Sequence, residues 1–223
     1  MDYVIFLVGS FLEYFAALVL MFALFRFRFD PRVFLNFALI SFMMSHVSYF
    51  TRLNPEIGDM SSYIQLILFI VILCLLFRVS IFYSIIMNFA AFVAGFVLQG
   101  IVFFVIFNQM SGITLSELQG NQLLLTTLMI VTSMFSLAIS RTLYVMNWNF
   151  DFVPTSNRTN VTIKGYNAII LVIIILSISI TAITSYFFRF KYDVYVVYSI
   201  LVFVISLPIF LYYAVRKDFD DAS

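Results

Sequence analysis

Residues 3–25 read YVIFLVGSFLEYFAALVLMFALF, and this stretch indicates the fold class. An α-helix needs about 20 consecutive apolar residues to cross the hydrocarbon core of a bilayer. The stretch is too long for the apolar core of a cleaved signal peptide, lacks a basic segment before it and contains Glu13. It therefore predicts a transmembrane helix of the mature protein.

Six further apolar stretches follow, separated by polar breaks. The seven predicted spans cover residues 3–25, 33–50, 60–77, 81–107, 121–140, 166–188 and 194–215. The chain is 64% hydrophobic and 10% charged, whereas a soluble domain has about 25% charged residues. We expect an all-α integral membrane protein, with residues 1–223 forming one multi-pass domain in the cell membrane.

The positions of the basic residues predict the orientation. With the N-terminus outside, nine of the 12 Lys and Arg residues fall in inner segments: Arg26, Arg28, Arg32, Arg78, Arg141, Arg158, Lys164, Arg216 and Lys217. The outer segments hold Arg52, Arg189 and Lys191. Because inner loops carry the excess of positive charge, we expect the N-terminus outside and the C-terminus in the cytoplasm.

Few residues could carry covalent or metal chemistry. The chain has a single cysteine, Cys74, and a single histidine, His46, so an internal disulfide is impossible and a Cys-based metal site is not expected. No supported Ser/His/Asp set, Gly-rich phosphate loop or pair of intramembrane acids is found. The sequence predicts no enzyme, no metal and no cofactor, and the net charge of +1 suggests no nucleic-acid partner.

Polar residues recur at middle to outer depth in five predicted spans. The candidate ligand-binding residues are Glu13, His46, Gln65, Gln99 and Thr126. An ionisable group inside the membrane is costly and is a functional candidate by default. Together the five predict a polar cavity open to the outside. The alternative is ordinary hydrogen bonding between helices, worth about 0.6 kcal/mol per bond.

Small residues also recur along helical faces, which favours close helix packing. The predicted packing faces are Gly9, Glu13 and Ala16; Ala91, Gly95 and Gln99; and Ser133, Ser136 and Ser140. The longest break, residues 141–165, is expected to form a short hairpin or to lie on the membrane surface.

Two stretches, FLEYFA at residues 11–16 and LFRVSIFY at residues 76–83, suggest a family. With the seven-span plan and the cytoplasmic C-terminus, they resemble the N-terminal sensor domain of accessory-gene-regulator-type histidine kinases of Gram-positive bacteria. The resemblance implies a receptor that senses an extracellular signal, often a peptide, and controls a cytoplasmic kinase. No kinase sequence follows the last span, so the chain would stand alone or act through a partner.

The expected function is therefore a receptor-like membrane domain. It would bind a small or peptidic extracellular ligand and signal through a cytoplasmic or membrane partner. One alternative is the substrate-binding membrane subunit of a transport system, and another is a structural or assembly protein. Membrane lipid surrounds the chain in each case, and a protein partner or a homo-oligomer is compatible with all three.

Overall fold

The computed structural model describes residues 3–54, 58–109, 121–153, 163–187 and 192–222. Nearly all of these residues are helical, and no strand occurs among them. The helices are α1 (Tyr3–Leu24), α2 (Pro31–Leu53), α3 (Ser61–Leu76), α4 (Ile81–Gln109), α6 (Gln122–Val145), α7 (Tyr166–Phe187) and α8 (Tyr192–Ala222), with a 3-10 turn, η1 (Gly58–Met60). The predicted all-α architecture is confirmed.

Six of the helices are long and apolar enough to cross a membrane, which indicates a multi-pass membrane protein. The helix α3 is apolar but has 16 residues. At a rise of about 1.5 Å per residue it is about 24 Å long, less than the roughly 30 Å hydrocarbon core. The third predicted span is therefore present as a helix, but its length alone does not establish that it crosses.

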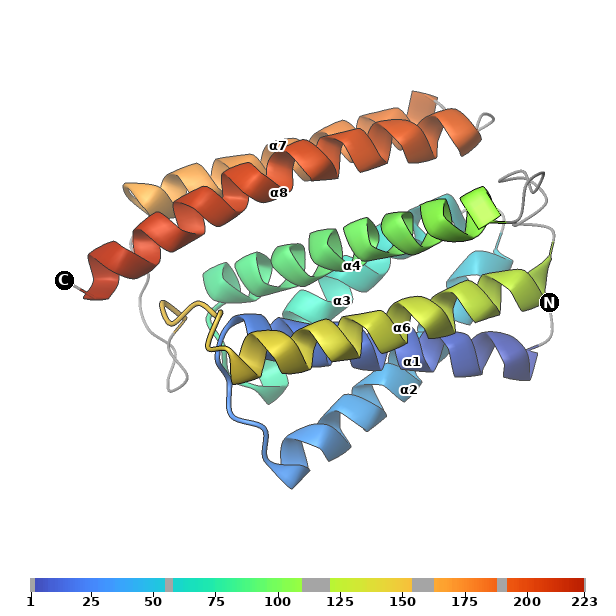
Figure 1. Ribbon diagram of the computed structural model, residues 1–223, viewed down its shortest axis with the longest axis horizontal. Coiled ribbons are helices and arrows are strands. Elements are labelled where there is room, and N and C mark those ends of the chain that lie inside the picture. Colours follow the sequence, from blue (N-terminus) through green and yellow to red (C-terminus); the bar gives the residue numbers. More distant parts are fainter. Residues whose placement is uncertain (1–2, 55–57, 110–120, 154–162, 188–191, 223) are drawn as a thin grey trace.

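The helices lie side by side, and the two chain termini lie at opposite ends of the bundle (Figure 1). We call the end at which α1 begins the N-terminal end, and the other the opposite end. The helix α1 packs most extensively on α6 and then on α2, while α7 and α8 form a pair. This pair meets the rest of the bundle mainly through α4.

The α1–α6 interface is close because small residues line it. An added Cβ on Gly9 would lie 3.1 Å from Thr126 Cγ2 and 3.2 Å from Met129 Sδ. One helical face of α6 contains Thr126 and Met129 together with three buried serines, Ser133, Ser136 and Ser140. The Ser133 hydroxyl donates a hydrogen bond to the Met129 carbonyl of its own helix at 2.7 Å, so it needs no partner on α1. Of the predicted α1 face, Gly9 thus contacts α6, Ala16 is also buried, and Glu13 is only partly covered.

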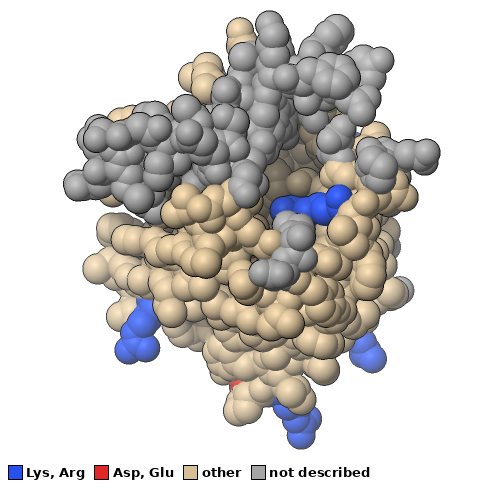
Figure 2. Space-filling model, turned by 90° about the vertical axis from the view of Figure 1, so that its right-hand side faces the viewer, with Lys and Arg blue, Asp and Glu red and all other residues tan. Residues whose placement is uncertain are grey.

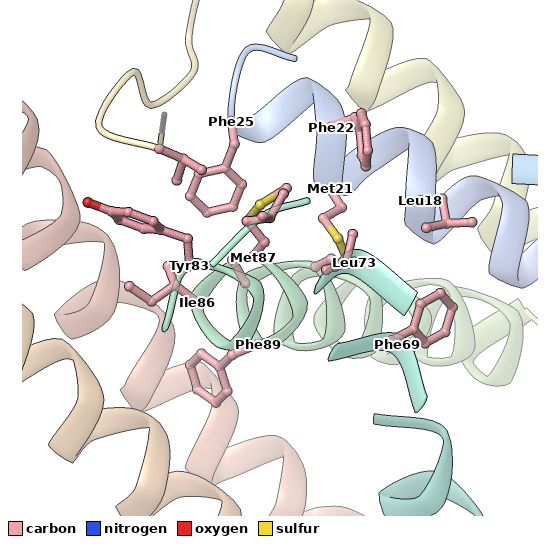
Figure 3. Close-up of a cluster of buried hydrophobic side chains, with 14 of the residues drawn as sticks. Leu18, Met21, Phe22, Phe25, Phe69, Leu73, Tyr83, Ile86, Met87 and Phe89 are labelled. Atoms are coloured by element: carbon pink, nitrogen blue, oxygen red, sulfur yellow. The ribbon is translucent and has the colours of Figure 1, made fainter. Parts of the chain in front are cut away.

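One core cluster, rich in large aromatic side chains, joins α1, α2, α3, α4, α7, α8 and the segment after α6. Figure 3 shows Met21 of α1 and Phe25, in the turn after α1, directed toward α4, where Tyr83 and Met87 lie. Phe22 is 1% exposed, and its ring centroid lies 4.8 Å from that of Phe77. This packing fixes the positions of α1 and α4 at the opposite end of the bundle.

Two helices end in the same left-handed turn, without glycine. Arg26 after α1 has φ 55° and Asn147 after α6 has φ 54°. The Phe27 N–H donates to the Phe22 carbonyl at 3.0 Å, and the Trp148 N–H donates to the Leu143 carbonyl at 3.0 Å. These bonds are the six-to-one bonds of a Schellman cap. At Arg26 the cation also lies at the negative end of the helix dipole.

The segment after α6 differs from its prediction. Instead of lying on the surface, residues 150–153 turn back into the bundle, where Phe150, Phe152 and Val153 are buried. The Phe150 N–H donates to the Leu24 carbonyl at 2.7 Å. For these residues the surface alternative is wrong, because Phe25 and Tyr83, distant in sequence, provide apolar partners for the Phe152 ring. Residues 154–162 of the same break lie outside the described residues.

Candidate functional site

The inner face of α2 is apolar at its start and polar toward its end. Ser41, Ser45, Ser48 and Arg52 follow one another at spacings of four, three and four, so they share one side of the helix. The three serines are 0% to 1% exposed. Arg52 continues this face into the last turn of α2. The predicted span ended at residue 50, and so this arginine was assigned to a loop.

A hydrogen-bonded chain joins α2 to α3 at the N-terminal end. The Gln65 amide Nε2 donates to Ser61 Oγ at 2.8 Å. Ser61 Oγ lies 2.6 Å from Thr51 Oγ1, and Thr51 Oγ1 donates to the Val47 carbonyl at 2.8 Å. Gln65 and Ser61 are buried. Their bonds satisfy polar groups that would otherwise be costly inside the bundle.

Two residues of α1 approach the same region. The Tyr14 side chain reaches toward Ser48 of α2, and its ring centroid lies 5.7 Å from that of Phe69 on α3. The charge of Arg52 acts on both Tyr14 and Glu13. We define the polar cluster as these residues of three helices: Glu13, Tyr14, Ser48, Thr51, Arg52, Ser61 and Gln65.

Glu13 is the acidic residue of this cluster. The Glu13 side chain is partly buried by neighbouring residues. Within the described residues, it has neither a hydrogen bond nor an ion pair. Within the described residues, Arg52 does not form a salt bridge with it. A carboxyl group in this setting can accept a proton, a cation or a hydrogen-bond donor.

Figure 2 looks onto the N-terminal end of the bundle. The face is hollowed near its centre, and a basic side chain lies at the edge of the hollow. Arg52, in the last turn of α2, belongs to this end of the bundle by the order of the helices. Its guanidinium carbon lies 5.5 Å from the Phe6 ring centroid. The Tyr49 ring packs on Phe6 at 5.6 Å, so the cation lies beside a pair of aromatic rings.

The structure brings together two of the five candidate residues. Glu13 and Gln65 belong to the polar cluster. Thr126 is buried, donates to the Gln122 carbonyl at 2.9 Å and contacts α1 at Gly9. His46 Nδ1 lies 2.7 Å from the Phe42 carbonyl of its own helix. Gln99 is half-buried on α4.

The polar cluster combines hydrogen-bonding groups with one acidic and one basic side chain. Arg52 supplies a cation for a carboxylate or a phosphate, and Glu13 supplies an acceptor. Within the described ranges, no three His, Cys, Asp or Glu side chains are grouped so that they could hold a metal ion. No known protein family, curated protein or solved structure matches this chain.

Proposed function

We propose that this chain is a receptor-like membrane domain with seven spans, its N-terminus outside and its C-terminus in the cytoplasm. The polar cluster would bind a small or peptidic ligand from outside, and a cytoplasmic or membrane partner would receive the signal. The observation that supports this most is the arrangement of Glu13 and Arg52. Both residues belong to this cluster, and within the described residues they form no ion pair with each other.

A ligand would complete this arrangement. A buried acid without a partner is costly inside a membrane protein, and a group that donates a hydrogen bond or a positive charge to Glu13 would remove that cost. A negative group on the same ligand would pair with Arg52, whose planar guanidinium suits carboxylates and phosphates. The Tyr49 ring, which is half-buried and packs on Phe6, lies beside Arg52 and offers an apolar contact for such a ligand.

Mass spectrometry of the protein purified in mild detergent tests this proposal. We expect a bound small molecule or peptide in the wild-type protein. Glu13→Gln and Arg52→Gln should each reduce its occupancy roughly tenfold or more, because each leaves a charged ligand group unpaired. Gln99→Leu is the matched control, since it removes a polar side chain of another helix, and it should keep the ligand. Equal occupancy in all variants, or no ligand in the wild type, would contradict the proposal.

The burial of α7 and α8 favours a second function, that of an assembly subunit. These two helices are the least buried of the six long apolar helices. Their outer faces carry large apolar side chains, among them Val172, Ile175, Leu176, Ile183, Leu201 and Ile205. Another membrane protein could cover them as well as lipid does. A protein that co-purifies in fixed stoichiometry, with no bound ligand, would favour this function over the receptor.

A further inference from the structure

At the opposite end of the bundle, a lysine lies inside a group of aromatic rings. Lys217 of α8 is 4% exposed. Its ammonium nitrogen lies 4.4 Å from the Phe152 ring centroid, 4.7 Å from that of Tyr83 and 5.5 Å from that of Phe82. We call these three rings the aromatic cage.

The geometry of the cage is that of a cation site. An ammonium within about 6 Å of a ring centroid is attracted by the negative face of the ring, and the attraction is strongest when the cation is removed from water. Lys217 meets this distance at three rings at once. Sites built from several aromatic rings are a common way for proteins to bind alkylammonium groups.

The rings of the cage come from two parts of the chain. Phe82 and Tyr83 lie in the first turn of α4, while Phe152 belongs to the segment that turns back after α6. The Phe152 ring also packs on Phe25 at 5.8 Å, which connects the cage to the end of α1. The single Lys217 side chain therefore contacts a junction of α1, α4 and the returning segment.

The neighbouring residue fastens α8 to the same segment. A carboxylate oxygen of Asp218 accepts a hydrogen bond from the Asp151 N–H at 2.8 Å. Asp151 in turn pairs with Arg26 at 3.2 Å, although both side chains are largely exposed, so this ion pair contributes little. Lys217 is the buried contact of the set, and it should dominate the attachment.

We propose that Phe82, Tyr83 and Phe152 form a binding site for a primary alkylammonium ion, and that the Lys217 side chain is its tethered occupant. Insertion of the ammonium holds the end of α8 against α1 and α4. Its departure frees that end and leaves the cage open to another alkylammonium group of similar size. The site lies at the opposite end from the polar cluster and does not depend on a ligand there.

Chemical rescue tests the proposal. We expect Lys217→Ala to raise the rate of hydrogen exchange at the amides of the last turns of α8 by roughly tenfold or more. Added n-propylammonium should slow this exchange again, because it fills the space that the lost side chain leaves between the cage and the docked end of α8 and so stabilises the docked state, whereas n-propanol, which has the same alkyl chain without charge, should not. Rescue by both compounds equally, or by neither, would overturn the proposal.

Two further variants keep the test decisive if Lys217→Ala does not fold. Lys217→Met retains the shape and apolar stem of the side chain but not its charge, and its last α8 turns should exchange roughly tenfold or more faster than those of the wild type. Arg216→Met is the matched control, because it removes a cation from the same turn that contacts Tyr212 rather than the cage. Wild-type exchange in Lys217→Met would show that the charge is not used and would overturn the proposal.

Discussion

Gly9→Leu is expected to unfold at a much lower temperature than the wild-type protein, in the same detergent. A Cβ at this position would already lie 3.1 Å from Thr126 Cγ2 and 3.2 Å from Met129 Sδ, so a leucine must push α1 and α6 apart. These two helices form the most extensive interface of the bundle. Overpacking of this kind costs about 1–3 kcal/mol, and more where backbones must separate.

Gly95→Leu is the control for this prediction. An added Cβ at Gly95 on α4 would meet nothing within 4 Å, and replacing a helical glycine by leucine gains up to about 1 kcal/mol of helix propensity. We therefore expect no loss of stability at this position. An equal loss at both glycines would mean that the α1–α6 packing described above is not what Gly9 provides.

Phe152→Ala is expected to destabilise the opposite end of the bundle by about 3–5 kcal/mol, the usual cost of removing a buried aromatic side chain. Phe152 is 6% exposed and packs on Phe25 and Phe150 at ring distances of 5.8 Å and 5.7 Å. Thermal unfolding in detergent, followed by near-ultraviolet circular dichroism, measures the loss.

Trp148→Ala provides the comparison within the same segment. Trp148 is 69% exposed, so its removal should change the unfolding temperature little. A larger effect at Trp148 than at Phe152 would show that residues 150–153 do not insert into the bundle as described.

Hydropathy alone predicted the helices. The first span, predicted at residues 3–25, is the helix Tyr3–Leu24, because a long apolar stretch allows only a helix in lipid. The predicted ends of the spans differ from the ends of the helices where polar residues continue a helix. The last helix reaches Ala222 and α2 includes Arg52, since hydropathy measures contact with lipid and not the end of the hydrogen-bonded turns.

Packing partners could not be predicted in the same way. Gly9 and Gly95 each lie on a face of small residues, yet only Gly9 has a close neighbour. The local sequence cannot say which helix lies opposite a face. The burial of Phe152 had no local signal either, because its partners Phe25 and Tyr83 are distant in sequence.

The candidate site was predicted in part. Glu13 and Gln65 were selected as polar residues in apolar spans, and both lie in the polar cluster. Arg52 was missed as a site residue, although its spacing from Ser48, Ser45 and Ser41 continues a single helical face. That periodicity was the available signal. The contact between His46 and the Phe42 carbonyl could not be predicted, because it depends on the rotamer of the histidine.

The accessibility of Thr51 tests the central claim most directly. Thr51 is half-buried in the polar cluster, and a Thr51→Cys variant in a Cys74→Ala background offers a single thiol there. We predict that a charged, membrane-impermeant thiol reagent labels it in intact cells from outside. A Lys164→Cys control, exposed at the opposite end, should react only after the membrane is opened. A Thr51→Cys thiol that reacts only in opened cells, or only after unfolding, would contradict the proposal that the polar cluster is accessible from outside.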